Sequence, residues 1–127
     1  HRTRVEDVFT VLPRLEAAGE RFDLVVLDPP SLARRKEQRA RAEHAYRTLN
    51  AQAARLVTSG GLLATASCTT QVAPRAFDAA VRAGLEDAGR RGSILVKGGH
   101  ALDHPVRRTF PEGTYLKFRL LQLDRSP

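Results

Sequence analysis

The sequence has very little cysteine, and its apolar residues form no long run. Cys68 is the only cysteine, so an internal disulfide is excluded and a reducing compartment is expected. One cysteine cannot supply a zinc site of ordinary ligand number, and the histidines lack a metal-ligand spacing, so we predict no metal. No apolar run approaches the roughly 18 residues of a membrane span, and no signal peptide opens the chain. These absences predict a cytoplasmic protein that is not membrane-embedded.

Basic residues outnumber acidic ones. The 127 residues include 21 Lys and Arg against 14 Asp and Glu, which gives a net charge of +7 and a pI near 10.7. Such a charge is typical of nucleic-acid binding, but also of ordinary soluble proteins from an arginine-rich proteome. Charge alone does not decide between them. With 42% hydrophobic residues, the chain is long enough for one domain with one core.

Helical and strand patterns alternate along the chain. Apolar spacing predicts helices over about residues 6–19 and 36–58, and a third that starts at Pro74 and ends near residue 88. Short apolar runs predict strands over 22–28, 62–68, 93–100 and 114–123, and Ser59–Gly61 is expected to separate the second helix from the second strand. This alternation predicts an α/β sheet with helices on both faces.

The first predicted strand ends abruptly in the stretch FDLVVLDPP. Its apolar run indicates a strand buried on both faces of a parallel sheet. Pro29 and Pro30 have no N–H and stop the ladder, so Asp28 should lie at the carboxyl end of the strand. Cys68 ends the next predicted strand. In open α/β sheets the carboxyl edge is where ligands bind, so Asp28 and Cys68 mark the expected site without specifying a reaction.

Three stretches together resemble one family of enzymes. FDLVVLDPP, SGGLLATASCTT and HPVRRTFPEGTYLK are similar to motifs of the class I S-adenosylmethionine-dependent RNA methyltransferases. They are most similar to the branch that makes 5-methylcytosine in large-subunit ribosomal RNA. The resemblance implies a Rossmann-like sheet whose last strand is antiparallel, S-adenosylmethionine as cofactor and ribosomal RNA as partner.

The resemblance covers only part of that family's pattern. The family's Gly-rich cofactor loop, its ribose-binding acid and its N-terminal RNA-binding region have no counterpart here. Residues 1–127 therefore resemble the C-terminal half of the catalytic domain, which predicts a fragment of a longer protein. A truncated sheet leaves an unpaired edge, so we also predict self-association, such as a homodimer, through that edge.

The resemblance assigns roles to residues at the carboxyl edge. It implies that Cys68 is the nucleophile that adds to C6 of cytosine; the alternative is that this thiol is only a small buried hydrophobic group. Asp28 would contact the N3/N4 edge of the base, or simply cap the following turn. Asp7 would meet the adenine amino group of the cofactor, and Pro29 would line the cofactor pocket together with Asp28.

A further set of residues is predicted to contact the substrate RNA. Arginine and lysine would meet phosphates, a histidine would shuttle a proton or bond to backbone, and a proline would shape the base pocket. The alternative for the basic residues is a solvated surface. The set comprises Pro30, Arg34, Arg35, His104, Arg107, Arg108 and Lys117.

Two other functions are consistent with the same sequence. Asp-Pro-Pro loops also serve amino-methyltransferases, in which an acid and a backbone carbonyl hold an exocyclic amine and no thiol is needed. A half-domain without a cofactor loop could also be a non-catalytic RNA-binding piece. Cys68 distinguishes the first of these from the cytosine-C5 enzyme, because only the latter requires the thiol.

Overall fold

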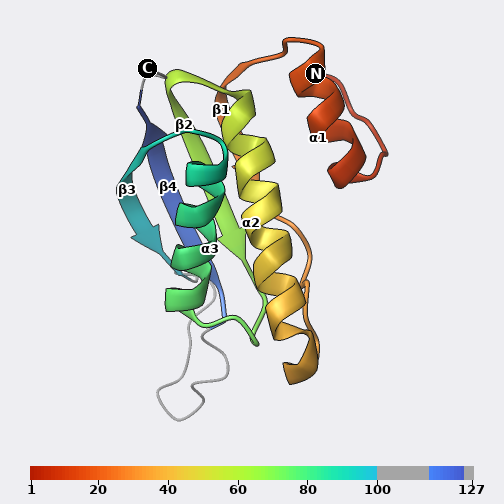
Figure 1. The fold of residues 1–127 in the computed structure, drawn as a ribbon, viewed down its shortest axis with the longest axis vertical. Helices are drawn as coiled ribbons and strands as arrows, with labels where there is room; N and C mark the ends of the chain where they lie inside the picture. Colours follow the sequence, from red (N-terminus) through yellow and green to blue (C-terminus); the bar gives the residue numbers. More distant parts are fainter. Residues whose placement is uncertain (100–114, 125–127) are drawn as a thin grey trace.

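The computed structural model describes residues 1–99 and 115–124, and its elements alternate along the chain (Figure 1). In chain order they are α1 (Val8–Ala17), β1 (Phe22–Leu27), the 3-10 helix η1 (Lys36–Gln38), α2 (Arg39–Leu56), β2 (Val57–Ser67), α3 (Pro74–Asp87), β3 (Gly92–Gly98) and β4 (Lys117–Leu123). The predicted elements that fall within these residues are all present. Residues 100–114, which include His104, Arg107 and Arg108, lie outside the described part.

The strands form one mixed sheet in the order β1-β2-β4-β3. β1 and β2 are parallel, with Leu27 opposite Thr65, whereas β4 is antiparallel to both β2 and β3. The α/β class and the antiparallel last strand are therefore confirmed. The carboxyl ends of β1, β2 and β3 consequently lie along one edge of the sheet.

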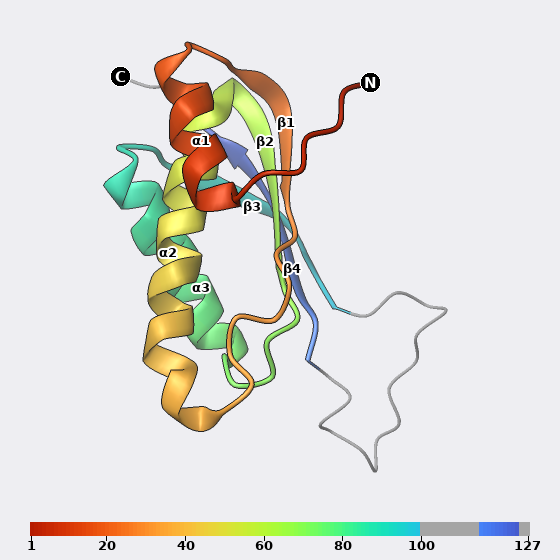
Figure 2. The same cartoon turned by 90° about the vertical axis from the view of Figure 1, so that its right-hand side faces the viewer.

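All three described α-helices cover the same face of the sheet (Figure 2). The expectation of helices on both faces is therefore wrong for the described residues. The reason is topological. The crossovers β1-α2-β2 and β2-α3-β3 both advance in one direction along the sheet, and right-handed crossovers that advance in one direction place their helices on one face.

The core lies between β2 and the helices α2 and α3. β2 is the most buried strand, and the T-shaped ring pair of Tyr46 and Phe77, with centroids 5.5 Å apart, joins the two helices. Fully buried aliphatic side chains surround this pair. They include Leu49, Leu56, Val57, Leu63, Val72 and Leu123.

β1 is more exposed than its sequence predicted. Its inward side chains Val25 and Leu27 pack on the helices, but Leu24 and Val26 on the other face are 51% and 66% exposed. The apolar run indicated burial on both faces. Within the described residues, however, β1 pairs only with β2, and no helix covers its second face.

Ser59–Gly61 belongs to β2 instead of separating it from the helix. β2 starts at Val57, directly after α2, and its pairing with β1 shifts register between Phe22 and Leu24. Gly60 has a φ of 81°, and a Cβ on Gly61 would lie 2.9 Å from the Asp23 carbonyl oxygen. The glycines therefore allow a bulge within the strand, where the sequence indicated a turn.

Gly84 allows α3 to approach α2 closely, and replacing it tests this packing. A Cβ at this position would lie 2.6 Å from the Arg47 carbonyl oxygen. We expect Gly84→Ala to lower the free energy of unfolding by roughly 1–3 kcal/mol, even though alanine favours helices more than glycine. Urea unfolding followed by circular dichroism measures this change.

The exposed Ala79 on the same helix supplies the matched control. Ala79→Ser should change the free energy of unfolding by less than about 0.5 kcal/mol. Equal or greater stability of Gly84→Ala relative to the unmodified chain would contradict the close approach of the two helices.

Candidate active site

Two parallel strands end side by side at the candidate site. Asp28 follows β1 directly and Cys68 follows β2 directly, and the register pairs Leu27 with Thr65. Asp28 is exposed, and its carboxylate makes no hydrogen bond or ion pair in the part of the chain that the structure describes, whereas Cys68 is a half-buried free thiol. The structure thus places both residues at the edge where the sequence predicted them.

The loop after β1 is fixed to the loop after β2. The backbone N–H of Leu32 donates to Thr69 Oγ1 at 3.0 Å, and Ser31 Oγ donates to the Ala33 carbonyl oxygen at 3.2 Å. Ala33 is only 4% exposed, so the loop that starts at Pro29 is anchored in the core. These contacts fix where Asp28 and Pro29 leave the sheet relative to Cys68.

Buried hydroxyl groups connect the floor of the site to α2. Tyr46, on α2, bonds through its hydroxyl to Thr69 Oγ1 and accepts a hydrogen bond of 2.9 Å from Ser67 Oγ. Burial raises the pKa of the Tyr46 phenol, its hydrogen bonds with Ser67 and Thr69 oppose this effect, and electrostatic interactions with Cys68 and Asp28 add to it. Tyr46 is therefore close enough to both predicted catalytic residues to respond to their charges.

This hydroxyl cluster was not predicted from the sequence. The ring of Tyr46 is buried on the apolar face of α2, as helical spacing predicts, but such a pattern gives no partner for its hydroxyl group. The available signal was the pair of hydroxyl residues that flank the cysteine in SCTT. Polar residues at the end of an apolar strand must find hydrogen-bond partners when they are buried.

Lys117 lies in a different environment from the one predicted. The sequence placed it among phosphate contacts, but its side chain is buried and its ammonium donates to the carbonyl oxygens of Thr69 and Val72, both at 2.7 Å. Burial lowers the pKa of this ammonium. A group held in this way faces the interior, away from a phosphate at the surface.

The other predicted RNA contacts in the described residues are at the surface. Arg34 and Arg35 are exposed in the loop that follows the Asp-Pro-Pro turn, and their backbone N–H groups donate to Gln38 Oε1 at 2.9 and 3.2 Å. Pro30 is also exposed. This leaves both guanidinium groups directed to solvent near the carboxyl edge of the sheet.

Asp7 occupies the N-cap of α1. Its Oδ1 accepts a hydrogen bond of 2.8 Å from the backbone N–H of Phe9, which satisfies one of the free donors at the start of the helix. Asp7 is exposed, so its second carboxylate oxygen can still accept a hydrogen bond from a ligand.

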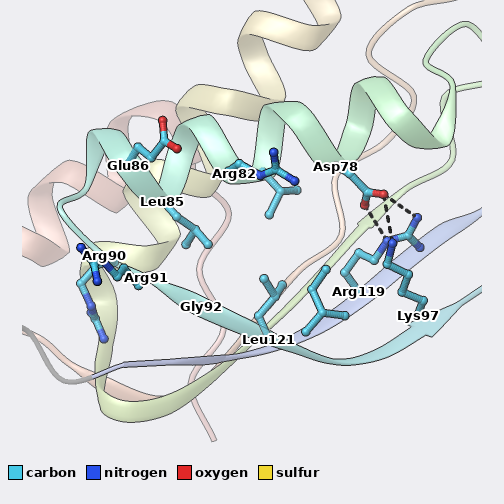
Figure 3. Close-up of a pocket in the computed structure, with 12 residues that line it drawn as sticks. Asp78, Arg82, Leu85, Glu86, Arg90, Arg91, Gly92, Lys97, Arg119 and Leu121 are labelled. Carbon is cyan, nitrogen blue, oxygen red and sulfur yellow. Dashed lines mark hydrogen bonds and ion pairs between the residues drawn. The ribbon is translucent and has the colours of Figure 1, made fainter.

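A separate cavity lies between α3 and the strands β3 and β4, and Figure 3 shows its lining. Its volume is about 420 Å³. Val81, Leu85 and Leu121 form an apolar floor, and neither Asp28 nor Cys68 contributes to the lining. The candidate active site is therefore a strand-edge site, distinct from this cavity.

An ion-pair cluster closes one end of the cavity (Figure 3). Arg119 Nε lies 2.7 Å from Asp78 Oδ1, and Lys97 Nζ lies 3.5 Å from Asp78 Oδ2. Burial opposes ionisation of Asp78, but the hydrogen bond and charge of Arg119 outweigh it, so the pKa of this carboxyl is below its ordinary value. The cluster joins α3 to β3 and β4.

Within residues 1–99 and 115–124, no His, Cys, Asp and Glu side chains gather in a group that could bind a metal ion. The same residues include no helix with the length and apolarity needed to cross a membrane.

Asp78→Asn tests the ion-pair cluster. We expect a loss of about 2 kcal/mol in the free energy of unfolding at neutral pH, because the buried Arg119 loses its charged acceptor. The folded-state pKa of Asp78 lies below its ordinary value of 3.8. Its stabilisation is therefore complete above pH 3.8 and is lost as the pH falls through the lower folded-state pKa. Urea unfolding across acidic pH measures this.

Asp87→Asn is the matched control, because the ion pair of Asp87 with Arg47 is exposed. An exposed pair contributes less than about 1 kcal/mol. If Asp78→Asn cost no more than Asp87→Asn at neutral pH, the cluster would contribute nothing beyond an ordinary surface pair.

Comparison with curated proteins finds relatives over nearly the whole chain. The ribosomal RNA large subunit methyltransferase of Deinococcus radiodurans is 41% identical over 124 residues, which are 98% of this chain and 30% of that protein. The ribosomal RNA large subunit methyltransferase I of Tolumonas auensis is 39% identical over 91% of this chain and 29% of that protein. This chain therefore spans less than a third of the length of these relatives. No protein-family model matches it.

Solved structures have the same fold. A crystal structure of a methyltransferase complexed with SAH superposes with a TM-score of 0.76 at 22% identity, covering 93% of this chain and 30% of that chain. A SAM-dependent methyltransferase from Streptococcus mutans gives a TM-score of 0.75 at 18% identity, with the same coverage. The chain is thus homologous to one segment of the large-subunit ribosomal RNA methyltransferases, and it has the fold of the SAM-dependent methyltransferases.

Proposed function

We propose that this chain is the C-terminal part of the catalytic domain of an S-adenosylmethionine-dependent methyltransferase that modifies C5 of a cytosine in large-subunit ribosomal RNA. The names of the relatives support ribosomal RNA as the substrate. The observation that carries the proposal is the position of Asp28 and Cys68 at the ends of two adjacent parallel strands. This arrangement would allow a carboxylate and a thiol to act on one base.

Cytosine C5 is a weak nucleophile, and Cys68 would activate it. In the proposed reaction the Cys68 thiolate forms a bond to C6, which turns the ring into an enamine whose C5 can accept a methyl group. A base then removes the proton from C5, the electrons of that bond restore the C5–C6 double bond, and the thiolate leaves. Asp28 would hold the N3/N4 edge of the ring by accepting a hydrogen bond from N4.

S-adenosylmethionine would supply the electrophilic methyl group to C5 and would leave as S-adenosylhomocysteine when its bond to that methyl group breaks. The residues of this chain fit one side of such a cofactor: Asp28 presents an exposed carboxylate, Pro29 follows it, and the N-cap Asp7 keeps one oxygen available. The Gly-rich loop and the ribose-binding acid expected in the family would have to come from the remainder of the parent protein.

The basic loop after the Asp-Pro-Pro turn would contact the RNA backbone. Arg34 and Arg35 are exposed beside the site, and guanidinium groups bind phosphates without reading sequence. His104, Arg107 and Arg108 remain predicted contacts. In this proposal the net charge of +7 reflects an RNA partner.

We also propose that the isolated chain associates with a second copy through β1. Phe22, Leu24 and Val26 are 40%, 51% and 66% exposed on this strand. Within the described residues, β1 has a pairing partner on one side only. Antiparallel pairing of two β1 strands would satisfy both edges by one symmetric contact and would bring these side chains beside those of the second copy.

Covalent trapping tests the cytosine-C5 reaction. The full-length parent protein would be incubated with S-adenosylmethionine and ribosomal RNA that contains 5-fluorocytosine. Fluorine at C5 cannot leave as a proton does, so the thiolate cannot be released. We expect a protein–RNA adduct that mass spectrometry maps to Cys68, and no adduct with Cys68→Ala.

Other outcomes distinguish the competing functions. Methylation of normal RNA by the Cys68→Ala protein would favour an amino-methyltransferase and would refute the thiol mechanism. RNA retention on a filter without methyl transfer, with or without the cofactor, would favour a non-catalytic RNA-binding piece.

Light scattering tests the association through β1. We expect the 127-residue chain to have the mass of a dimer or larger species, and Val26→Lys to shift it toward the monomer because a charge disfavours burial of the edge. Lys36→Ala, a change at an exposed position outside the sheet, is the control. A monomeric unmodified chain would count against the proposal.

A further inference from the structure

Lys117 is a buried cation without an acidic partner in the described part of the chain. It is 5% exposed, and its ammonium donates to two backbone carbonyl oxygens. The acid Asp78 is bound by two other cations of the sheet, Arg119 and Lys97 (Figure 3). Burying an ammonium group is costly unless it is paired, and an apolar side chain of similar length would avoid that cost. Packing alone therefore does not account for a lysine here.

The contacts of Lys117 bracket Cys68 along the chain. In the β2–β4 register Lys117 lies opposite Ser67, the residue before Cys68. Its ammonium bonds to the carbonyl oxygen of Thr69, the residue after Cys68, and to that of Val72 in the same loop. The segment that carries the thiol is thus held before Cys68 by strand pairing with Lys117 and after Cys68 by the ammonium of the same residue.

Charge as well as position couples the two residues. Burial lowers the pKa of the Lys117 ammonium, and an electrostatic interaction with Cys68 opposes this effect. Such an interaction is mutual, so the Lys117 ammonium creates a positive potential at the neighbouring sulfur. The Tyr46 phenol interacts with both Cys68 and Asp28 and provides no positive charge, whereas Arg119, which also interacts with Lys117, is paired with Asp78.

We propose that Lys117 is a positioning residue for Cys68: it holds the loop that carries the thiol and places a buried positive charge behind the sulfur. The electrostatic part concerns the thiol itself. Its catalytic consequence, faster attack on the base, rests on the function proposed above. The same side chain was expected to bind phosphate at the surface, so this role is a new assignment.

Alkylation of the single cysteine provides a direct test. Iodoacetamide is neutral and iodoacetate is an anion, and both react with the thiolate. A positive charge near the sulfur accelerates iodoacetate relative to iodoacetamide, so the ratio of the two rates reports the local charge. The exposure of the sulfur and the fraction of thiolate change the rates of both reagents alike, so their effects largely cancel in the ratio of the two rates. Because Cys68 is the only cysteine, the modified protein needs no further mapping.

We expect Lys117→Met to lower the iodoacetate-to-iodoacetamide ratio by roughly fivefold, the effect of one unit charge at short range in a water-like medium. Lys117→Arg keeps the charge and should retain most of the ratio. Lys97→Met removes an exposed cation of β3 that contacts Asp78, and it should leave the ratio within about twofold of the unmodified chain because exposed charges are screened.

Equal ratios in Lys117→Met and Lys97→Met would overturn the proposal. Circular dichroism establishes that each variant is folded. If Lys117→Met does not fold, the unmodified chain is compared with itself in urea. A higher ratio in the folded state than in the unfolded state supports the proposal, and equal ratios refute it.

The test separates this inference from the proposed function. The alkylation ratio needs neither RNA nor cofactor, so it can succeed even if no cytosine adduct forms. Conversely, an adduct at Cys68 together with an unchanged ratio in Lys117→Met would leave the thiol mechanism intact and remove Lys117 from it.

Discussion

The parallel pairing of β1 and β2 is the constraint on which the candidate site depends. The crossover through α2 returns the chain to the edge of the sheet at which β1 begins. Both strands therefore run in one direction, and their carboxyl ends lie at the opposite edge. This is a general property of open α/β sheets. It places Asp28 at the same edge of the sheet as a thiol forty residues away in the sequence.

Buried polar groups then fix the positions of the loops that follow β1 and β2, which strand pairing alone does not determine. The Tyr46 hydroxyl, Ser67 and Thr69 satisfy one another beneath the site, and the Leu32 N–H joins the neighbouring loop to the same cluster. Lys117 adds a cation from the antiparallel strand β4. A buried polar group without partners costs free energy, so these contacts strongly restrict the two loops.

The helices cover one face of the sheet, and this asymmetry bears on what the chain can do alone. Its second face carries exposed apolar side chains of β1, and the chain spans about 30% of the length of its relatives. A cofactor site in this fold draws on more than one strand end. In the proposed reaction the chain would supply the carboxylate and the thiol, and one side of a cofactor pocket.

The sequence by itself determined the order of helices and strands, the α/β class and the placement of Asp28 and Cys68 at strand ends, because apolar periodicity and the Asp-Pro-Pro stop are local signals. Resemblance added the antiparallel last strand. Only the tertiary structure decided that the helices share one face, that β1 is an edge, and that the glycines near residue 60 form a bulge. It also turned Lys117 inward. These features depend on partners distant in sequence, and a local pattern cannot specify which distant group a side chain will meet.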